Sequence, residues 1–437
     1  MGSEREARES ETGGARGAAG PGRAAVHPVV ATFRLPHYAR LWSSNLLQFI
    51  CFQVLFLAMQ WLVTSISPLR SAVGLIGFVQ GGTIALCSPM AGVVVDRAAK
   101  RDLIVAGRFA MAFISLAVGL LVWSGQVAYW MLVAVSVFGG LVASVLGPAT
   151  QTYVVDVVGR ERTHEAVSLN AMGTSFGTMG GGALAGVLVG AVGLVATYFS
   201  AAVGVLIAAL LVIGIPTLGA VARAEGVRSP WADLREGYAY VRERPPLLLA
   251  LLACAMALFN GAVNPMRPIF ARHVLDVGAS GFGMLSAAHG VGTFIAALGV
   301  MLRPPHPRHV GLLIAGTMLG YAIGLVLYSL GFSFGWALGV EVWLGFTGQL
   351  WNVVAIVGFQ LAVPEAMRGR VLSMVFTLAQ LGFVGILAVG ALADAVGDQL
   401  ALGIFGAIPT VLLTGLLAFG WRTLKKMGSA EGEEGIA

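Results

Sequence analysis

Three ionisable side chains stand inside stretches of this sequence that otherwise carry no charge. Glu341 is the only charged residue between positions 309 and 364, and Arg267 is the only one between 245 and 271. His289 lies within the uncharged interval 277–302. A carboxylate and a guanidinium form a pair that protonation of the carboxylate breaks, and histidine titrates near neutral pH. We therefore expect Arg267 and Glu341 to pair. All three residues are candidates for coupling transport to protons. A static ion pair and a packing histidine are the alternatives.

Further polar side chains recur at helical spacing within the same uncharged intervals. Asn260, Asn264 and Arg267 follow the spacing i, i+4, i+7, which places them on one helix face. Taken singly, each amide also fits a hydrogen bond to a neighbouring helix. Together they are the predicted lining of a substrate cavity, whose candidate residues are Asn45, Gln48, Phe52, Gln80, Gln151, Asn260, Asn264, Gln349, Asn352 and Gln380.

The elements that position these side chains follow from composition. The chain has 437 residues, of which 57% are hydrophobic and 11% charged, whereas globular proteins carry about 25% charged residues. Ten long intervals lack Asp, Glu, Lys and Arg, and a membrane helix needs about 20 apolar residues. Eight intervals hold one crossing each, while 109–155 divides at Ser124-Gly125-Gln126 and 166–222 divides near residues 190–193. The prediction is an all-α membrane protein with twelve transmembrane helices.

The basic residues predict the orientation. If the N-terminus lies inside, 24 of the 27 Lys and Arg residues fall in cytoplasmic segments, among them Arg97 to Arg108, and only Arg70, Arg267 and Arg272 lie outside. This is the bias of the positive-inside rule. The net charge of +6 therefore reflects topology and contact with membrane lipids, with no nucleic-acid partner.

The order of polar and apolar segments predicts two halves. We expect a disordered cytoplasmic tail over 1–36, a six-helix bundle over 37–216, a cytoplasmic linker with an amphipathic helix over 217–246, a second six-helix bundle over 247–421 and a tail over 422–437. Ala191-Val192-Gly193 returns as Ala395-Val396-Gly397, at corresponding places in the two bundles. Such internal symmetry is typical of secondary transporters.

The turn after the second crossing, Gly92-Val93-Val94-Val95-Asp96-Arg97-Ala98-Ala99-Lys100-Arg101, resembles the G-x3-D-R-x-G-R-R signature of the major facilitator superfamily. Leu41-Trp42, Trp61-Leu62-Val63 and Gly390-Ala391-Leu392-Ala393-Asp394 resemble its drug-efflux branch, which includes macrolide and enterobactin exporters. The resemblance implies two pseudo-symmetric six-helix bundles and a cytoplasmic gate formed by Gly92, Asp96, Arg97, Lys100 and Arg101. It also implies that the helices carrying Arg267 and Glu341 line one half of the cavity, so we expect their pair at its outer mouth. A loop that merely obeys the positive-inside rule is the alternative for Lys100 and Arg101.

Three positions depart from the family patterns. Ala99 replaces a glycine of the loop signature, and Gly182 replaces the proline of an antiporter signature that the stretch 173–186 resembles. Phe52 stands where the branch often has aspartate, so one expected route for proton coupling is missing. The G-x-S-x-G match at residues 173–177 lies inside a crossing, whereas a nucleophile elbow needs a strand-to-helix turn.

No nucleotide-binding or HExxH motif occurs, and the three cysteines have no paired spacing, so we expect neither an enzyme nor a bound metal or cofactor. The predicted function is export of small amphipathic molecules by alternating access, with proton coupling, by a monomer in a bacterial inner membrane with both termini cytoplasmic. The alternatives are an uncoupled facilitator or importer, and a scaffold or sensor that kept the fold.

Overall fold

The computed structural model describes residues 33, 35, 37–159, 162–216, 230–303 and 309–427. The N-terminal half contains α2 (Tyr38–Ile66), α3 (Arg70–Arg97), α4 (Lys100–Ser124), α5 (Tyr129–Val158), α6 (Thr163–Val187) with its π-helical extension η2 (Leu188–Val192), and α7 (Gly193–Ile213). After α8 (Pro230–Arg242), the C-terminal half contains α9 (Pro245–Ala255), α10 (Ala257–Asn260), α11 (Val263–Ile269), η3 (Phe270–Val274), α12 (Gly278–Leu302), α13 (Val310–Ser329), α14 (Phe334–Ala362), α15 (Glu365–Gln380), α16 (Gly382–Val396) and α17 (Asp398–Lys425).

These helices form twelve crossings, as predicted. Within the described residues, ten uninterrupted stretches are long and apolar enough to span a membrane. One of them, Met172–Ile213, contains two crossings because the chain reverses at Gly193 between α6 and α7. The remaining crossing, the eleventh along the chain, is made by α15 together with the shorter apolar helix α16.

The internal symmetry is visible in two reversals of the chain. Gly193 has φ 83° and ψ 171°, and Gly397 has φ 92° and ψ 158°. L-residues with a side chain rarely adopt such positive φ values, so both turns need glycine. The repeated Ala-Val-Gly therefore encodes the same turn between the fifth and sixth crossings of each half.

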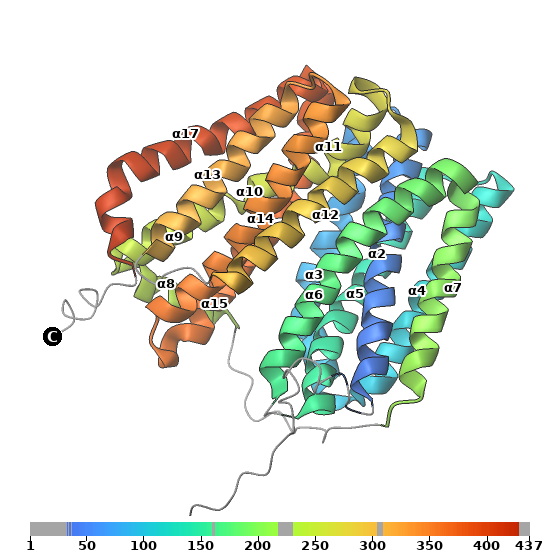
Figure 1. Cartoon of the computed structure of the whole chain (residues 1–437), viewed down its shortest axis with the longest axis horizontal. Coiled ribbons are helices and arrows are strands. Elements are labelled where there is room, and N and C mark those ends of the chain that lie inside the picture. Colours follow the sequence, from blue (N-terminus) through green and yellow to red (C-terminus); the bar gives the residue numbers. More distant parts are fainter. Residues whose placement is uncertain are drawn as a thin grey trace, which may run out of the picture.

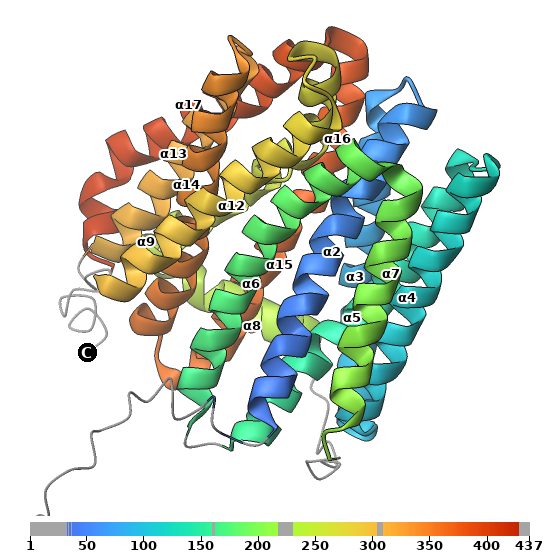
Figure 2. The ribbon, with the colours of Figure 1, turned by 45° about the vertical axis from the view of Figure 1, so that its right-hand side comes forward.

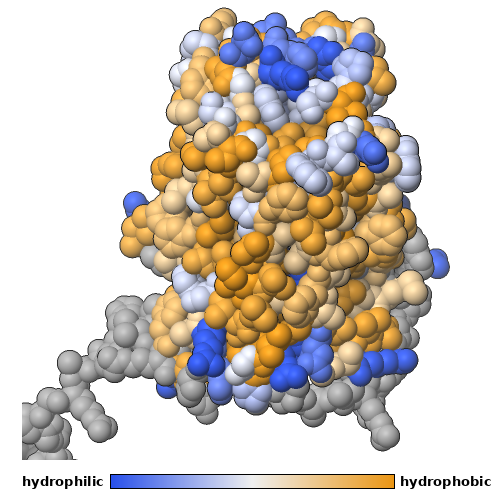
Figure 3. Space-filling model, turned by 90° about the vertical axis from the view of Figure 1, so that its right-hand side faces the viewer, coloured by the Kyte–Doolittle hydropathy of each residue, from blue (hydrophilic) through white to orange (hydrophobic). Residues whose placement is uncertain are grey.

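The outer surface carries a broad apolar band between two polar ends (Figure 3). Large apolar side chains are exposed on it, including Phe113 on α4, Trp130 on α5 and Leu210 on α7. Soluble monomers rarely expose apolar patches of this extent. The band is the surface that faces lipid in this multi-pass membrane protein.

The two halves meet through α6 with α12 and through α3 with α16. Figures 1 and 2 show the ribbons of the halves close together at one end and diverging toward the other. We call the end that carries Arg97, Lys100 and Arg370 the basic end, and the opposite end, with Arg70 and Asp398, the far end. Gly186 and Gly283 let α6 and α12 approach closely, since a Cβ added to Gly186 would lie 2.5 Å from Gly283 Cα.

Polar contacts join the halves at the far end. The guanidinium of Arg70 pairs with Asp398 at 3.0 Å, and the backbone N–H groups of Arg70 and Ser71 donate to Asp394 at 2.7 and 3.0 Å. Asp394 thus accepts the free amides at the start of α3, where the helix dipole also favours a negative charge. Arg272 donates to Thr64 at 3.2 Å across the same interface.

Four sequence-based expectations have different outcomes in the structure. Arg108 is not part of a basic loop, because α4 already begins at Lys100 and Arg108 lies buried within it. The predicted seventh crossing is present as the span Pro245–Val274, which consists of the successive segments α9, α10, α11 and η3. The predicted amphipathic helix exists as α8, which packs on α15 and joins it by an ion pair of 3.0 Å between Glu236 and Arg370. The tail through residue 32 and the linker over 217–229 lie outside the described residues.

Candidate functional site

Arg267 and Glu341 form the expected pair. Arg267 Nε and Nη2 donate to the two carboxylate oxygens of Glu341 at 2.8 and 3.0 Å, which is a bidentate arrangement. The side chain of Glu341 is 0% exposed and that of Arg267 is 6% exposed. Two full charges are thus withdrawn from solvent, and each depends on the other for compensation. The pair is sealed in the C-terminal half and does not face an open outer mouth.

His289 is the third member of this group. Its Nδ1 lies 3.0 Å from Glu341 Oε2. Since an ionised carboxylate only accepts hydrogen bonds, Nδ1 carries the proton when Glu341 is charged, which leaves Nε2 as the position that can gain one. The His289 side chain keeps 23% of its surface exposed, so it is the most accessible of the three groups. We call Arg267, His289 and Glu341 the charged triad.

Each triad residue comes from a different helix. Arg267 lies on the short helix α11, His289 on α12 and Glu341 on α14. Gly345 on α14 and Gly292 on α12 leave no space for a Cβ: at both positions it would lie 1.9 Å from a carbonyl oxygen of the other helix. This close approach brings His289 within hydrogen-bond distance of Glu341. The triad therefore joins three helices through side-chain hydrogen bonds.

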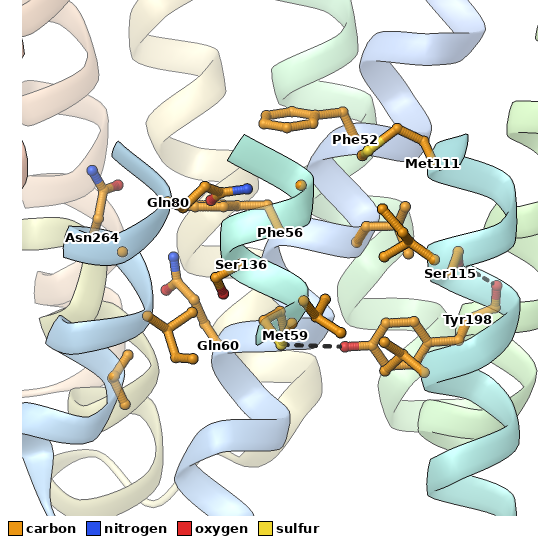
Figure 4. Close-up of a pocket in the computed structure, with 18 of the residues that line it drawn as sticks. Phe52, Phe56, Met59, Gln60, Gln80, Met111, Ser115, Ser136, Tyr198 and Asn264 are labelled. Atoms are coloured by element: carbon orange, nitrogen blue, oxygen red, sulfur yellow. Dashed lines mark hydrogen bonds between the residues drawn. The ribbon is translucent and has the colours of Figure 1, made fainter. Parts of the chain in front are cut away.

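A cavity lies in the N-terminal half where it meets the C-terminal half (Figure 4). The space between its lining residues is about 780 Å³ when the open solvent at its mouth is included. Its lining is mostly apolar, and none of the described lining residues is charged. The labelled residues in Figure 4 are Phe52, Phe56, Met59, Gln60, Gln80, Met111, Ser115, Ser136, Tyr198 and Asn264.

The cavity includes three of the ten predicted lining residues: Phe52, Gln80 and Asn264. Asn264 reaches it from the C-terminal half and stands one helical turn before Arg267 on α11, so the cavity and the charged triad share a helix. Phe56, Met59 and Gln60 were missed, although they extend the predicted face of α2 beyond Phe52 by four, seven and eight residues.

The other predicted lining residues lie elsewhere. Asn45 and Gln48 are buried within the N-terminal half, Asn352 and Gln151 are exposed outside this cavity, and Gln349 is half-buried. The backbone carbonyl of Asn260 accepts a hydrogen bond from Tyr321 at 2.9 Å. The side chain of Gln380 lies outside the described part of the structure. Helical spacing alone could not distinguish a face toward the cavity from one toward a neighbouring helix.

Arg108 is a polar centre that the sequence reading missed. It is 1% exposed and donates to Asn45 Oδ1 at 2.7 Å, to the carbonyl oxygen of Ala208 at 2.9 Å and to Ser44. The sequence could have indicated this, because Arg108 lies eight residues after the start of α4 and therefore well inside a crossing. It was instead assigned to the basic loop that precedes the helix.

Among the described side chains, the predicted gate residues form no hydrogen bond or ion pair between the halves. Lys100 pairs with Asp156 of α5 at 2.7 Å, and Arg101 pairs with Asp102 at 2.9 Å, both within the N-terminal half. Arg97 is exposed, and a Cβ at Gly92 would meet nothing within 4 Å. The side chain of Asp96 lies outside the described residues. The halves diverge at this end, so the gate assignment stays a prediction.

Comparisons with known proteins agree with this architecture. The sequence profile of the family described as "Transmembrane secretion effector" matches residues 28–434. The enterobactin exporter EntS of Shigella boydii is 27% identical over 305 residues, covering 68% of this chain and 71% of that protein. The enterobactin exporter of Escherichia coli O139:H28 matches with the same identity and coverage.

Solved structures share the fold at low sequence identity. A bacterial homologue of the human lysosomal transporter Spinster, in an inward-facing and unoccupied conformation, has a TM-score of 0.68 and 15% identity, and the match covers 94% of this chain and 100% of that one. A POT family transporter in complex with 5-aminolevulinic acid has a TM-score of 0.70 and 12% identity, with coverages of 88% and 96%.

Proposed function

The chain belongs to the transmembrane secretion effector family of major facilitator transporters, and from this we propose that it exports small amphipathic molecules across a bacterial inner membrane in exchange for protons. That it is a membrane transporter and not an enzyme follows from the family. Direction, coupling and substrate are our proposals. The observation that carries the coupling is the buried carboxylate of Glu341, held between Arg267 and His289, and Arg267 shares α11 with Asn264 of the cavity lining.

The triad supplies a chemical basis for coupling. When Glu341 is ionised, it accepts two hydrogen bonds from Arg267 and one from His289. A proton on Glu341 removes the negative charge and leaves the buried Arg267 without its counter-ion, which is costly in a membrane protein interior. The helices then favour an arrangement in which Arg267 finds another partner. Protonation therefore biases one conformation over the other, which is the requirement for coupling.

The cavity supplies the basis for cargo. Aromatic rings and thioethers from Phe52, Phe56 and Met59 offer apolar contacts, while Gln60 and Gln80 offer amides. Such a lining accepts bulky molecules with a few hydrogen-bonding groups. The related exporters are named for enterobactin, so enterobactin is the first candidate cargo to test.

Cycling between two access states needs gates at both ends. In this structure the far end is joined by the Arg70–Asp398 ion pair and by Asp394, while the halves diverge at the basic end. We assign the basic end to the cytoplasm, where both termini then lie. In the opposite state, we propose, Asp96 and Arg97 take part in the contacts that close the basic end.

Transport by purified protein in liposomes tests the proposal. Proteoliposomes would be loaded with pyranine, and uptake of labelled enterobactin would be measured with and without an imposed pH gradient. We expect gradient-dependent uptake with wild type, and Glu341→Gln should lose the gradient dependence and the proton flux. Glu243→Gln, at an exposed carboxylate of the basic end, is the matched control and should behave like wild type.

Two results would contradict parts of the proposal. Gradient-dependent uptake that persists in Glu341→Gln removes Glu341 from the coupling role. If uptake by the wild-type protein does not depend on the pH gradient, the protein is an uncoupled facilitator instead.

A further inference from the structure

Arg108 differs from every other buried charge in the described structure. Arg267, the other buried arginine, is neutralised by Glu341. Arg108 is surrounded by neutral acceptors on α2 and α7, namely Ser44, Asn45 and the carbonyl of Ala208. Among the described residues no carboxylate lies within 4.0 Å of it, and its buried Nε has no acceptor. Its positive charge is therefore hydrogen-bonded but not neutralised.

The position of Arg108 connects it to the cavity. On α4, Arg108, Met111 and Ser115 follow i, i+3, i+7, so they lie on one helix face. Met111 and Ser115 line the cavity, and Met111 stands about 4.5 Å farther along the axis than Arg108. Phe52 of α2 lies beside Met111 at one edge of the cavity (Figure 4). The guanidinium of Arg108 binds Ser44 and Asn45, which precede Phe52 on α2 by eight and seven residues, or about 10–12 Å along the helix axis.

The surroundings let this charge act over a distance. Since none of the described lining residues is charged, nothing at the cavity wall cancels the field of Arg108. Solvent screening is weak around a side chain that is 1% exposed. At an effective dielectric constant of about 20 and a separation of about 10 Å, one charge changes the affinity of a monovalent ligand roughly tenfold.

We propose that Arg108 makes this cavity select anionic over cationic amphipathic molecules. The inference rests on the proposed function, because it takes the cavity as the place where substrate binds. It narrows the cargo to molecules that carry a carboxylate, sulfonate or other anionic oxygen group, or no charge, on an apolar body. Arg108 acts through its field and need not touch the ligand.

If Arg108 had a purely structural role, that role would depend on a different property of its side chain. Arg108 joins α2, α4 and α7 through its hydrogen bonds. That role depends on the planar guanidinium, which lysine does not reproduce, whereas the field depends only on the charge. Arg108→Lys therefore separates the two roles.

The test uses two probes of the same shape and opposite charge, tetraphenylborate and tetraphenylphosphonium. Binding of each ion is measured by equilibrium dialysis against protein in lipid nanodiscs. Each ion also partitions into the lipid, but this contribution is the same for all variants and drops out when their affinities are compared. Arg108→Gln should weaken tetraphenylborate about tenfold and strengthen tetraphenylphosphonium by a similar factor. Arg108→Lys should keep the wild-type ratio of the two affinities.

A second pair of variants leaves Arg108 and its hydrogen bonds in place. Phe52→Asp adds a negative charge at the cavity edge and should shift the ratio in the same direction as Arg108→Gln, while Phe52→Asn should not. If Arg108→Gln fails to fold, Asn45→Asp takes its place, because a carboxylate there would neutralise the guanidinium of Arg108 that now donates to Asn45 Oδ1, and it should shift the ratio in the same direction.

The outcomes separate this inference from the proposed function. An unchanged ratio in Arg108→Gln and Phe52→Asp, or an equal shift in Arg108→Lys and Arg108→Gln, overturns the charge selection even where enterobactin transport succeeds. A shifted ratio supports it even where the pH-gradient experiment fails. Absence of binding by both ions in wild type refutes the cavity assignment that the two proposals share.

Discussion

Arg267 on α11 holds both carboxylate oxygens of Glu341 on α14, at 2.8 and 3.0 Å, although 74 residues separate them in the chain. The two side chains are almost completely withdrawn from solvent. A buried pair of this kind contributes little net stability, but removing one partner is costly because the other charge stays behind. This asymmetry gives the first prediction.

Replacement of Arg267 alone should destabilise the protein much more than replacement of both partners. We expect Arg267→Met to cost about 3–5 kcal/mol, and the double variant Arg267→Met/Glu341→Met to recover most of that loss. Thermal unfolding in detergent, followed by tryptophan fluorescence, measures both. Arg422→Met, at an exposed position near the end of α17, is the control and should change stability by no more than about 1 kcal/mol. Equal losses in the single and double variants would argue against mutual compensation.

Loss of Asp394 should open the far end. Asp394→Asn removes the charge that accepts the amides of Arg70 and Ser71 and so weakens both hydrogen bonds. Spin labels at Gln126 and Phe332, exposed in opposite halves at this end, should report an added population at longer distance. Glu243→Gln should leave the distance distribution unchanged, and an unchanged distribution in Asp394→Asn would show that the contacts of Asp394 do not hold the far end closed.

A methyl group between α6 and α12 should weaken the contact of the halves. A Cβ at Gly186 would lie 2.5 Å from Gly283 Cα, whereas a Cβ at Gly180, also on α6, would meet nothing within 4 Å. We expect Gly186→Ala to lower stability by about 1–3 kcal/mol through overpacking. Gly180→Ala should be neutral or stabilising by about 0.5–1 kcal/mol, since alanine favours helix. Equal melting temperatures for both variants would contradict this packing.

The proposed orientation predicts which end is accessible from outside the cell. In a chain without its three native cysteines, Phe332→Cys at the far end should react with a membrane-impermeant maleimide in intact cells. Arg303→Cys, at the basic end, should react only after the membrane is permeabilised. The reverse pattern would place the termini outside.

The sequence determined the twelve crossings and the two-half design by itself. Hydropathy is a property of each segment, because a helix in lipid must satisfy its own backbone groups whatever its neighbours are. The turn at Gly193 and its counterpart at Gly397 were likewise visible as a local repeat. The pairing of Arg267 with Glu341 was also predictable, since two isolated opposite charges inside a membrane protein need each other.

Only the tertiary structure decided which polar residues share a site. Helical spacing fixes the face of a residue but not what that face meets, so Asn45 turned out to bind Arg108, whereas Asn264 lines the cavity. The third triad member, His289, is placed by the close packing of α12 on α14 through Gly292 and Gly345. Arg108 is buried because α2 and α7 cover it. Contacts of this kind join segments that are far apart in the chain, so the sequence of one segment does not reveal them.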